Sequence, residues 1–148
     1  MPSSDITVSS PQSIADFEMY FTLRYEVLRK PWNQSRGSEQ DLEEETSVHA
    51  LIKENSKALA VGRLQFVDHN TSQVRYMAVG PEQQGKGLGK LVLEYLEEKS
   101  LSAGRKKVVL HARENAIKFY ERCGYKVIEK SHLLWGEIQH YLMEKSLQ

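Results

Sequence analysis

Residues 79–90, which read VGPEQQGKGLGK, join a predicted strand to a predicted helix. The apolar run before them ends at Val79, and Pro81, which has no backbone N–H to donate to a sheet, stops the strand. Apolar residues then recur at the spacing of one helix face: Leu88, Leu91, Val92, Tyr95 and Leu96. We therefore predict a strand-to-helix turn.

Glycines occupy alternate positions at the start of this helix, at Gly85, Gly87 and Gly89. Because glycine has no side chain, the first backbone N–H groups of the helix are uncovered. These N–H groups have no acceptor within the helix. Such a helix start binds anions, because the free N–H groups and the positive end of the helix dipole point the same way. Lys86 and Lys90 add positive charge. The pattern favours a pyrophosphate cradle over a tight turn whose glycines serve packing alone.

Three phosphate-binding motifs are candidates for this turn. The dinucleotide pattern Gly-x-Gly-x-x-Gly does not fit the alternate spacing. The P-loop pattern of triphosphate-binding proteins fits from Gly80 to Lys86, but Gly87 stands where that motif needs Ser or Thr for magnesium. The pattern (Gln/Arg)-x-x-Gly-x-(Gly/Ala) is met by Gln84, Gly87 and Gly89. In this motif the chain resembles the GNAT superfamily of N-acyltransferases, which bind acyl-coenzyme A with it.

A second block of sequence supports the resemblance. Residues 115–125 read NAIKFYERCGY and are similar to the second conserved block of that superfamily. The resemblance covers about residues 48–145. It implies that acetyl-CoA is the cosubstrate and that coenzyme A lies in a notch where two neighbouring parallel strands splay apart.

Composition and charge bound the possible partners and locations. The 148 residues suit one domain, 1–148, and the 20 basic residues balance the 20 acidic ones, so we expect neither nucleic acid nor a membrane as a partner. A lone cysteine makes no internal disulfide, and no metal-ligand spacing occurs in the sequence. Residues 1–11 lack the positive and apolar regions of a signal peptide, and we expect a cytoplasmic protein.

The hydrophobic pattern predicts the order of the elements. A short strand over 5–9 precedes an amphipathic helix over 11–30, in which Ser10 and Pro11 form the helix start. Residues 32–46 are polar and acidic and are predicted to be a surface loop or short helix. Alternating segments joined by short turns predict antiparallel strands over 48–53, 57–68 and 73–79, with a bulge at Gly62.

The second half of the chain alternates helices and strands. A helix over 85–102 ends at Gly104, and a strand over 107–111 follows, parallel to 73–79. Asn115 is predicted to cap the next helix, which Gly124 closes. Strands over 125–130 and 138–145 complete an α+β fold: a mixed, mostly antiparallel sheet flanked by helices. The resemblance adds that its parallel strand pair is splayed.

The resemblance also implies which residues contact the coenzyme. Backbone groups at the end of the 73–79 strand would bind the pantetheine arm and thioester: Met77, Ala78 and Val79. The turn would bind the pyrophosphate through Gln84, Gly85, Lys86, Gly87, Leu88, Gly89 and Lys90. Asn115 would hydrogen-bond the coenzyme arm, which is compatible with a capping role.

Tyr120 is the residue that the resemblance assigns to catalysis. In many family members the tyrosine at this place stands beside the thioester sulfur, where it can protonate the leaving thiolate; a core aromatic is the alternative. The general base stays open between water and four side chains: His111, His140, Glu137 and Glu26. Cys123 is interpreted as a small core residue, because no Cys-His-acid set surrounds it.

The resemblance implies that the acceptor is an amine of a small molecule or peptide, and it makes a homodimer possible, because dimers are common in the superfamily. Arg24 and Arg29 could meet an acidic acceptor, although arginines on a helix surface usually face solvent. A domain that binds acyl-CoA without turnover is the main alternative. A nucleoside triphosphate-binding domain is disfavoured, because the turns at 55–56 and 68–72 predict antiparallel strands rather than a parallel sheet.

Overall fold

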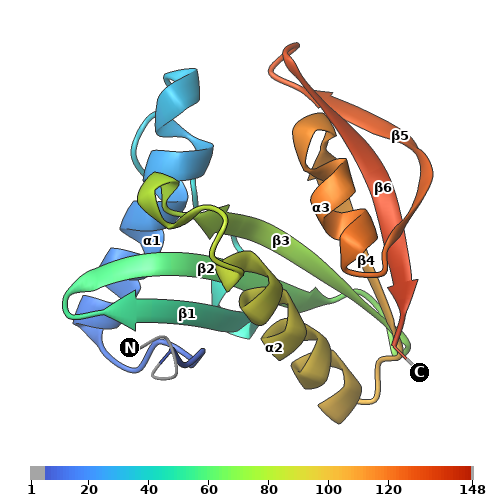
Figure 1. Ribbon diagram of the computed structural model, residues 1–148, viewed down its shortest axis with the longest axis horizontal. Helices are drawn as coiled ribbons and strands as arrows, with labels where there is room; N and C mark the ends of the chain where they lie inside the picture. The colour runs from blue at the N-terminus through green and yellow to red at the C-terminus, as the bar shows by residue number, and fades with distance from the viewer. Residues whose placement is uncertain (1–5, 148) are drawn as a thin grey trace.

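The computed structural model describes residues 6–147, which form a six-stranded mixed sheet flanked by helices (Figure 1). The strand order is β1-β2-β3-β4-β6-β5. The strands are β1 Val48–Glu54, β2 Lys57–Phe66, β3 Thr71–Val79, β4 Lys107–Arg113, β5 Lys126–Leu134 and β6 Ile138–Ser146. The helices are α1 Ile14–Leu28, α2 Leu88–Ser102 and α3 Ile117–Arg122. Among these strands only β3 and β4 pair in parallel, and the predicted fold class is confirmed.

The parallel pair is splayed. β3 and β4 are paired only from Thr71 opposite Lys107 to Val74 opposite Leu110. Beyond that point β3 continues to Val79 and β4 to Arg113 without pairing to each other. Figure 1 shows the result: β1, β2 and β3 run across the molecule, whereas β4, β6 and β5 rise away from them.

A bulge in β3 lies where the two strands separate. Arg75 is opposite Arg63 and Ala78 is opposite Val61, so Tyr76 and Met77 together face the single residue Gly62. Tyr76 has φ of 58°, an uncommon value for a residue with a side chain. Because a bulge bends its strand and increases the local twist, it turns the end of β3 away from β4. The sequence predicted a bulge at Gly62, and the structure has one at this level, but the extra residue belongs to β3 and not to the strand of Gly62.

The helices cover both faces of the sheet. α1 packs on one face, where its residues Tyr20, Leu23 and Leu28 join a core cluster with Leu51 and Val61. α2 and α3 contribute to the larger core on the other face, as Figure 1 shows. None of the helices within residues 6–147 has the length and apolar character needed to cross a membrane.

Several predicted boundaries were wrong. α1 begins at Ile14 rather than near Pro11, because Ser13 is its N-cap and accepts a hydrogen bond from the Asp16 N–H at 3.1 Å. The predicted strand over 5–9 is reduced to one bridge between Ser9 and Leu51, and Asp5 lies outside the described residues. α2 begins at Leu88 and not at 85, because the two preceding glycines have positive φ.

The acidic segment after α1 is not the solvated loop that its polarity suggests. Arg24, expected to face solvent, is fully buried and pairs with Glu44 at 2.8 Å. Arg63 is also fully buried and pairs with Asp41 at 2.6 Å and with Glu44 at 2.9 Å. Two buried arginines therefore fix this segment against α1 and β2.

Candidate active site

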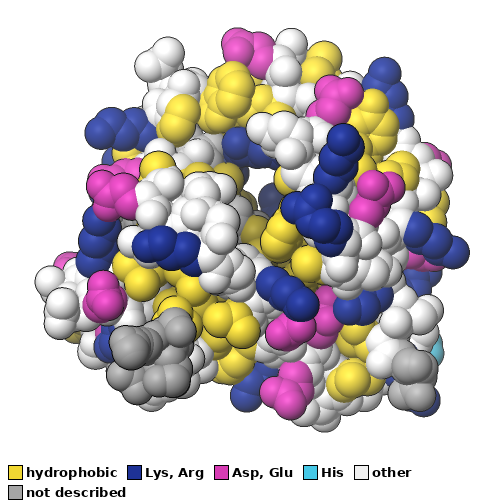
Figure 2. All heavy atoms as spheres, in the orientation of Figure 1, with side chains coloured by type: hydrophobic (Ala, Val, Ile, Leu, Met, Phe, Trp, Pro, Cys, Tyr) yellow, Lys and Arg dark blue, Asp and Glu magenta, His cyan; other side chains and the backbone are white. Residues whose placement is uncertain are grey.

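A cavity of about 820 Å³ opens where β3 and β4 separate. The cavity lies between the end of β3, the start of α2, and α3. Figure 2 shows a hollow at the centre of this face of the molecule, with Lys and Arg side chains around it. Of the twelve predicted site residues, eleven line it: Met77, Ala78, Val79, Gln84, Gly85, Gly87, Leu88, Gly89, Lys90, Asn115 and Tyr120. Lys86 is not among the lining residues, and its Nζ donates to Gln83 Oε1 at 3.2 Å.

The glycine-rich turn presents bare backbone to this cavity. Gly85 and Gly87 have φ of 79° and 80°, and a Cβ on either would meet nothing within 4 Å, so the space beside the turn is open. Gly87 is the N-cap of α2, and neither a capping side chain nor an acidic residue occupies the first turn. A Cβ at Gly89 would lie 3.2 Å from Phe119 Cζ, so this glycine lets α2 approach α3. The geometry suits an anion such as a pyrophosphate.

Tyr120 lines the cavity from α3. The residue is 8 % exposed, and its hydroxyl makes no hydrogen bond to any other residue within 6–147. Burial raises the pKa of Tyr120, so the hydroxyl remains a proton donor at neutral pH. The hydroxyl oxygen is not one of the buried polar atoms that lack a partner, so it is accessible from the cavity and free for a bound molecule.

Asn115 and Cys123 belong to the second conserved block, residues 115–125, and they also lie at the cavity. Asn115 is not a helix cap: it lies within the 3-10 turn Glu114–Ala116, and the N-cap of α3 is Ala116. It still lines the cavity. Cys123 packs against the core and lines the same cavity, and burial raises the pKa of its thiol, which disfavours a nucleophilic thiolate.

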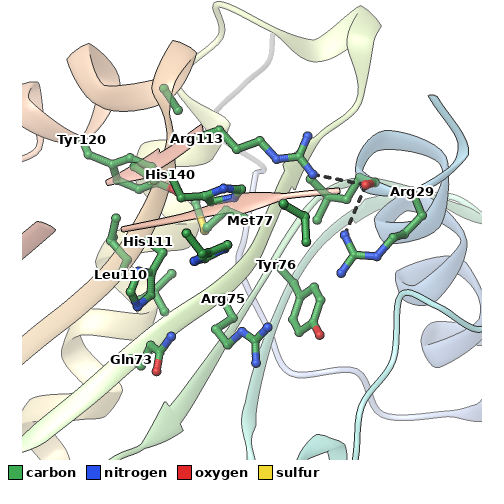
Figure 3. Close-up of a pocket in the computed structure, with 16 residues that line it drawn as sticks. Arg29, Gln73, Arg75, Tyr76, Met77, Leu110, His111, Arg113, Tyr120 and His140 are labelled. Atoms are coloured by element: carbon green, nitrogen blue, oxygen red, sulfur yellow. Dashed lines mark hydrogen bonds between the residues drawn. The ribbon is translucent and has the colours of Figure 1, made fainter. Parts of the chain in front are cut away.

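A second, smaller cavity of about 230 Å³ adjoins the first and is shown in Figure 3. Its walls come from the end of α1 and from β3, β4, β5 and β6. Tyr120, Met77 and Arg113 line both cavities, so the two spaces meet at Tyr120. This position suits the acceptor of a transferred group.

Three histidines line the smaller cavity: His111, His132 and His140. His140 Nδ1 lies 2.9 Å from the carbonyl oxygen of Ile138, which only accepts, so Nδ1 carries the proton and Nε2 the lone pair of the neutral ring. Burial is the main reason that the pKa of His140 falls to about 4, and the ring is neutral at pH 7. No group of three His, Cys, Asp or Glu side chains within 6–147 is arranged to hold a metal ion.

The four side chains considered as general base are not equivalent in the structure. His111 and His140 line the smaller cavity. Glu26 and Glu137 are exposed and line neither cavity. His132, which the sequence analysis missed, stacks on His140 with ring centroids 4.2 Å apart. The antiparallel pairing of β5 with β6 brings the two rings together. The predicted strand over 125–130 ended before His132, whereas β5 continues to Leu134, so the prediction did not place this histidine beside His140.

A sheet split at a parallel strand pair, with a glycine-rich helix start at the split, defines the class of GNAT-type N-acetyltransferases. A family model described as the acetyltransferase (GNAT) family matches residues 16–125, and the chain belongs to this family. The predicted enzyme class, an N-acetyltransferase, is thereby confirmed.

The chain is similar in sequence or in fold to other acetyltransferases. YjcF of Bacillus subtilis strain 168, an uncharacterized N-acetyltransferase, is 27 % identical over 125 residues, which cover 84 % of this chain and 89 % of YjcF. An aminoglycoside 6'-N-acetyltransferase in complex with coenzyme A has the same fold, with a TM-score of 0.81 and 14 % identity over 96 % of this chain and 97 % of its own. A GNAT family acetyltransferase from Elizabethkingia anophelis with acetyl-CoA bound has a TM-score of 0.75 and 15 % identity, covering 98 % and 100 %.

Proposed function

We propose that this protein transfers an acetyl group from acetyl-CoA directly to a primary amine. The observation that carries the proposal is the larger cavity, in which a bare glycine-rich helix start and the free Tyr120 hydroxyl share one space. Structural neighbours with coenzyme A or acetyl-CoA bound support a coenzyme A thioester as the cosubstrate.

In this proposal the turn and the end of β3 hold the coenzyme. The N–H groups at the start of α2 bind the pyrophosphate, with Lys90 beside them. The unpaired backbone groups of Met77, Ala78 and Val79 bind the pantetheine arm, because the splay leaves them without a sheet partner on the β4 side. Lys86 contributes charge near the turn rather than a direct contact.

The chemistry follows from the position of Tyr120. Acetyl-CoA supplies an activated thioester, whose carbonyl carbon forms a bond to the amine nitrogen as the carbon–sulfur bond breaks. Tyr120 donates its hydroxyl proton to the departing thiolate sulfur and regains a proton from solvent. The protein holds both reactants at the junction of the two cavities, which supplies the proximity that the transfer needs.

The attacking amine must lose a proton, and His140 is the side chain best placed to take it. Its Nε2 carries a lone pair at neutral pH, because Nδ1 is committed to the Ile138 carbonyl. Because the pKa of His140 is near 4, its ring is a weak base. The ring therefore accepts the proton as the amine nitrogen becomes bonded to the carbonyl carbon, and it then passes the proton to water.

Calorimetric titration with acetyl-CoA, with ATP and magnesium as the control ligand, tests the cosubstrate. We expect acetyl-CoA to bind and ATP to give no heat of binding. Binding of ATP instead would overturn the assignment. Binding of acetyl-CoA with no thiol release across a broad amine panel would favour the non-catalytic alternative.

The variant Tyr120→Phe tests the proton donor. We expect kcat to fall about 100-fold or more, which is the range of general acid catalysis, while the Kd for acetyl-CoA stays the same. Tyr95→Phe, on α2 and outside both cavities, is the matched control. Unchanged turnover in Tyr120→Phe would remove its catalytic role.

A further inference from the structure

The smaller cavity is positively charged. Three arginines, Arg29, Arg75 and Arg113, line it together with the three histidines, and none of its lining residues is Asp or Glu. Arg75 has a partner in Asp41 at 3.3 Å. Within residues 6–147, neither Arg29 nor Arg113 has a carboxylate within ion-pair distance. Two guanidinium groups therefore face this space without a counter-charge.

These two guanidinium groups converge on one point. Arg29 Nη1 and Arg113 Nη2 each donate to the carbonyl oxygen of Leu28, both at 3.2 Å. Figure 3 shows the two groups turned toward that oxygen, one from the residue that follows α1 and the other from the end of β4. Arg29 is fixed further, because its Nε donates to the Ser38 carbonyl at 3.0 Å. Burial lowers the pKa of both side chains, and for Arg113 the charge of Arg29 adds to the effect.

Such a pair is suited to an anion. A guanidinium presents several N–H groups in a planar fork that matches a carboxylate or phosphate. Each of these two is held by one or two backbone carbonyls, which leaves further N–H groups for a ligand. An anion placed there would also offset the repulsion between the two positive charges.

The pair lies at the right place for a substrate group. Arg29 and Tyr120 lie on opposite sides of the cavity in Figure 3, and Arg113 reaches between them. A small acceptor with its anionic group at the arginines would therefore have its other end directed toward Tyr120. The surrounding positive charge also disfavours the protonated form of a bound amine, and so favours the neutral nucleophile.

We propose that the acceptor is a small amine that also carries an anionic group, a carboxylate or a phosphate, and that Arg29 and Arg113 bind this group. The inference rests on the proposed acetyl transfer and specifies its substrate class. We expect polycationic amines to be poor acceptors, because their positive charges and the positively charged cavity repel each other.

Matched amines test the charge preference. Acetyl-CoA-dependent thiol release is measured with 4-aminobutyrate and its neutral amide, and with phosphoethanolamine and ethanolamine; spermidine is the cationic probe. We expect kcat/KM to be at least about tenfold higher for the anionic member of one pair, and the pair that responds distinguishes carboxylate from phosphate.

The arginine variants test the site itself. We expect Arg29→Gln and Arg113→Gln each to raise KM for the preferred anionic amine about 10- to 100-fold, with little change for its neutral partner. In Arg29→Gln the Kd for acetyl-CoA stays the same, because Arg29 lines the smaller cavity and not the larger one, and this separates loss of the anion subsite from misfolding. Arg36→Gln is the matched control, because Arg36 is exposed and lines neither cavity.

The outcomes separate this inference from the proposed function. Absence of acetyl-CoA binding overturns both. Binding and turnover with equal rates for neutral and anionic amines, or a preference for spermidine, overturn the anionic acceptor alone. If no amine is turned over, the same anionic probes are titrated into the coenzyme A complex, and absence of binding there also overturns it.

Discussion

At the residue scale, Gly62 shows how one side chain's absence shapes the site. A Cβ at this position would lie 2.7 Å from both Met77 Sδ and Val92 Cγ1. The glycine therefore allows α2 to pack close to the sheet directly beneath the bulge that separates β3 from β4. The larger cavity and the absence of this side chain are parts of one packing arrangement.

We expect Gly62→Ala to lower the free energy of unfolding by about 1–3 kcal/mol, the usual effect of overpacking a core. Urea unfolding followed by circular dichroism measures the change. Gly80→Ala is the control, because a Cβ there has no neighbour closer than 3.6 Å and φ is an ordinary −56°. Equal stability of Gly62→Ala and the wild type would show that Met77 and Val92 move aside freely.

The contrast between Gly62 and Arg24 shows what sequence can predict at this scale. A glycine within a strand pattern indicates a bulge on local grounds, and the structure has one. Arg24 is buried because Glu44, twenty residues further on, comes back to pair with it. Local periodicity contains no sign of such a pairing, so its charge suggested solvent. The convergence of Arg29 and Arg113 on Leu28 depends on long-range folding in the same way.

At the element scale, the segment between α1 and β1 depends on ion pairs. Asp41 is bound by Arg63 at 2.6 Å and Arg75 at 3.3 Å. Burial alone would raise the pKa of Asp41, but hydrogen bonds from Arg63 and from the Glu43 N–H, together with these positive charges, lower it to about 2. The segment lies beside the smaller cavity, because Arg75 and Tyr76, which line that cavity, both contact Asp41.

The sign of the resulting pH dependence follows from linkage. An unfolded aspartate titrates near pH 3.9, so the stabilisation from Asp41 is fully present above that value and is lost as the pH falls toward 2. We expect the urea midpoint to fall between pH 4.5 and about 2, and to fall less steeply in Asp41→Asn. Glu45→Gln, an exposed residue of the same segment, should retain the wild-type slope. Parallel curves for Asp41→Asn and the wild type would contradict this role.

Element boundaries were predictable where local chemistry alone decides them. Gly104 and Gly124 follow α2 and α3 with φ of 81° and 99°, as a glycine after a helix should. The start of α1 was not predictable in this way, because Ser10 and Ser13 both have capping hydroxyls. The structure selects Ser13, whose helix places Asp16 at 2.6 Å from Lys53 of β1. A contact with a distant strand therefore decides a boundary that the local sequence leaves open.

At the scale of the whole molecule, the split sheet has a consequence for stability. Its two halves are hydrogen-bonded to each other across only four residue pairs of β3 and β4. The larger cavity has walls from both halves, since β3 and the start of α2 belong to one side and Arg113 and α3 to the other. A ligand in that cavity therefore adds contacts between parts of the sheet that the chain itself joins weakly.

We expect acetyl-CoA at 100 times its Kd to raise the free energy of unfolding by about 2.7 kcal/mol, as for any ligand that binds only the folded state. The split predicts where the protection lies: hydrogen exchange should slow at residues 77–79, along the turn 84–90 and at 113–116, on both sides of the cavity. ATP with magnesium should change neither quantity. Protection confined to the turn would mean that the ligand is held by its phosphates alone and does not join the two halves, which would leave Tyr120 and the thioester apart and contradict the proposed transfer.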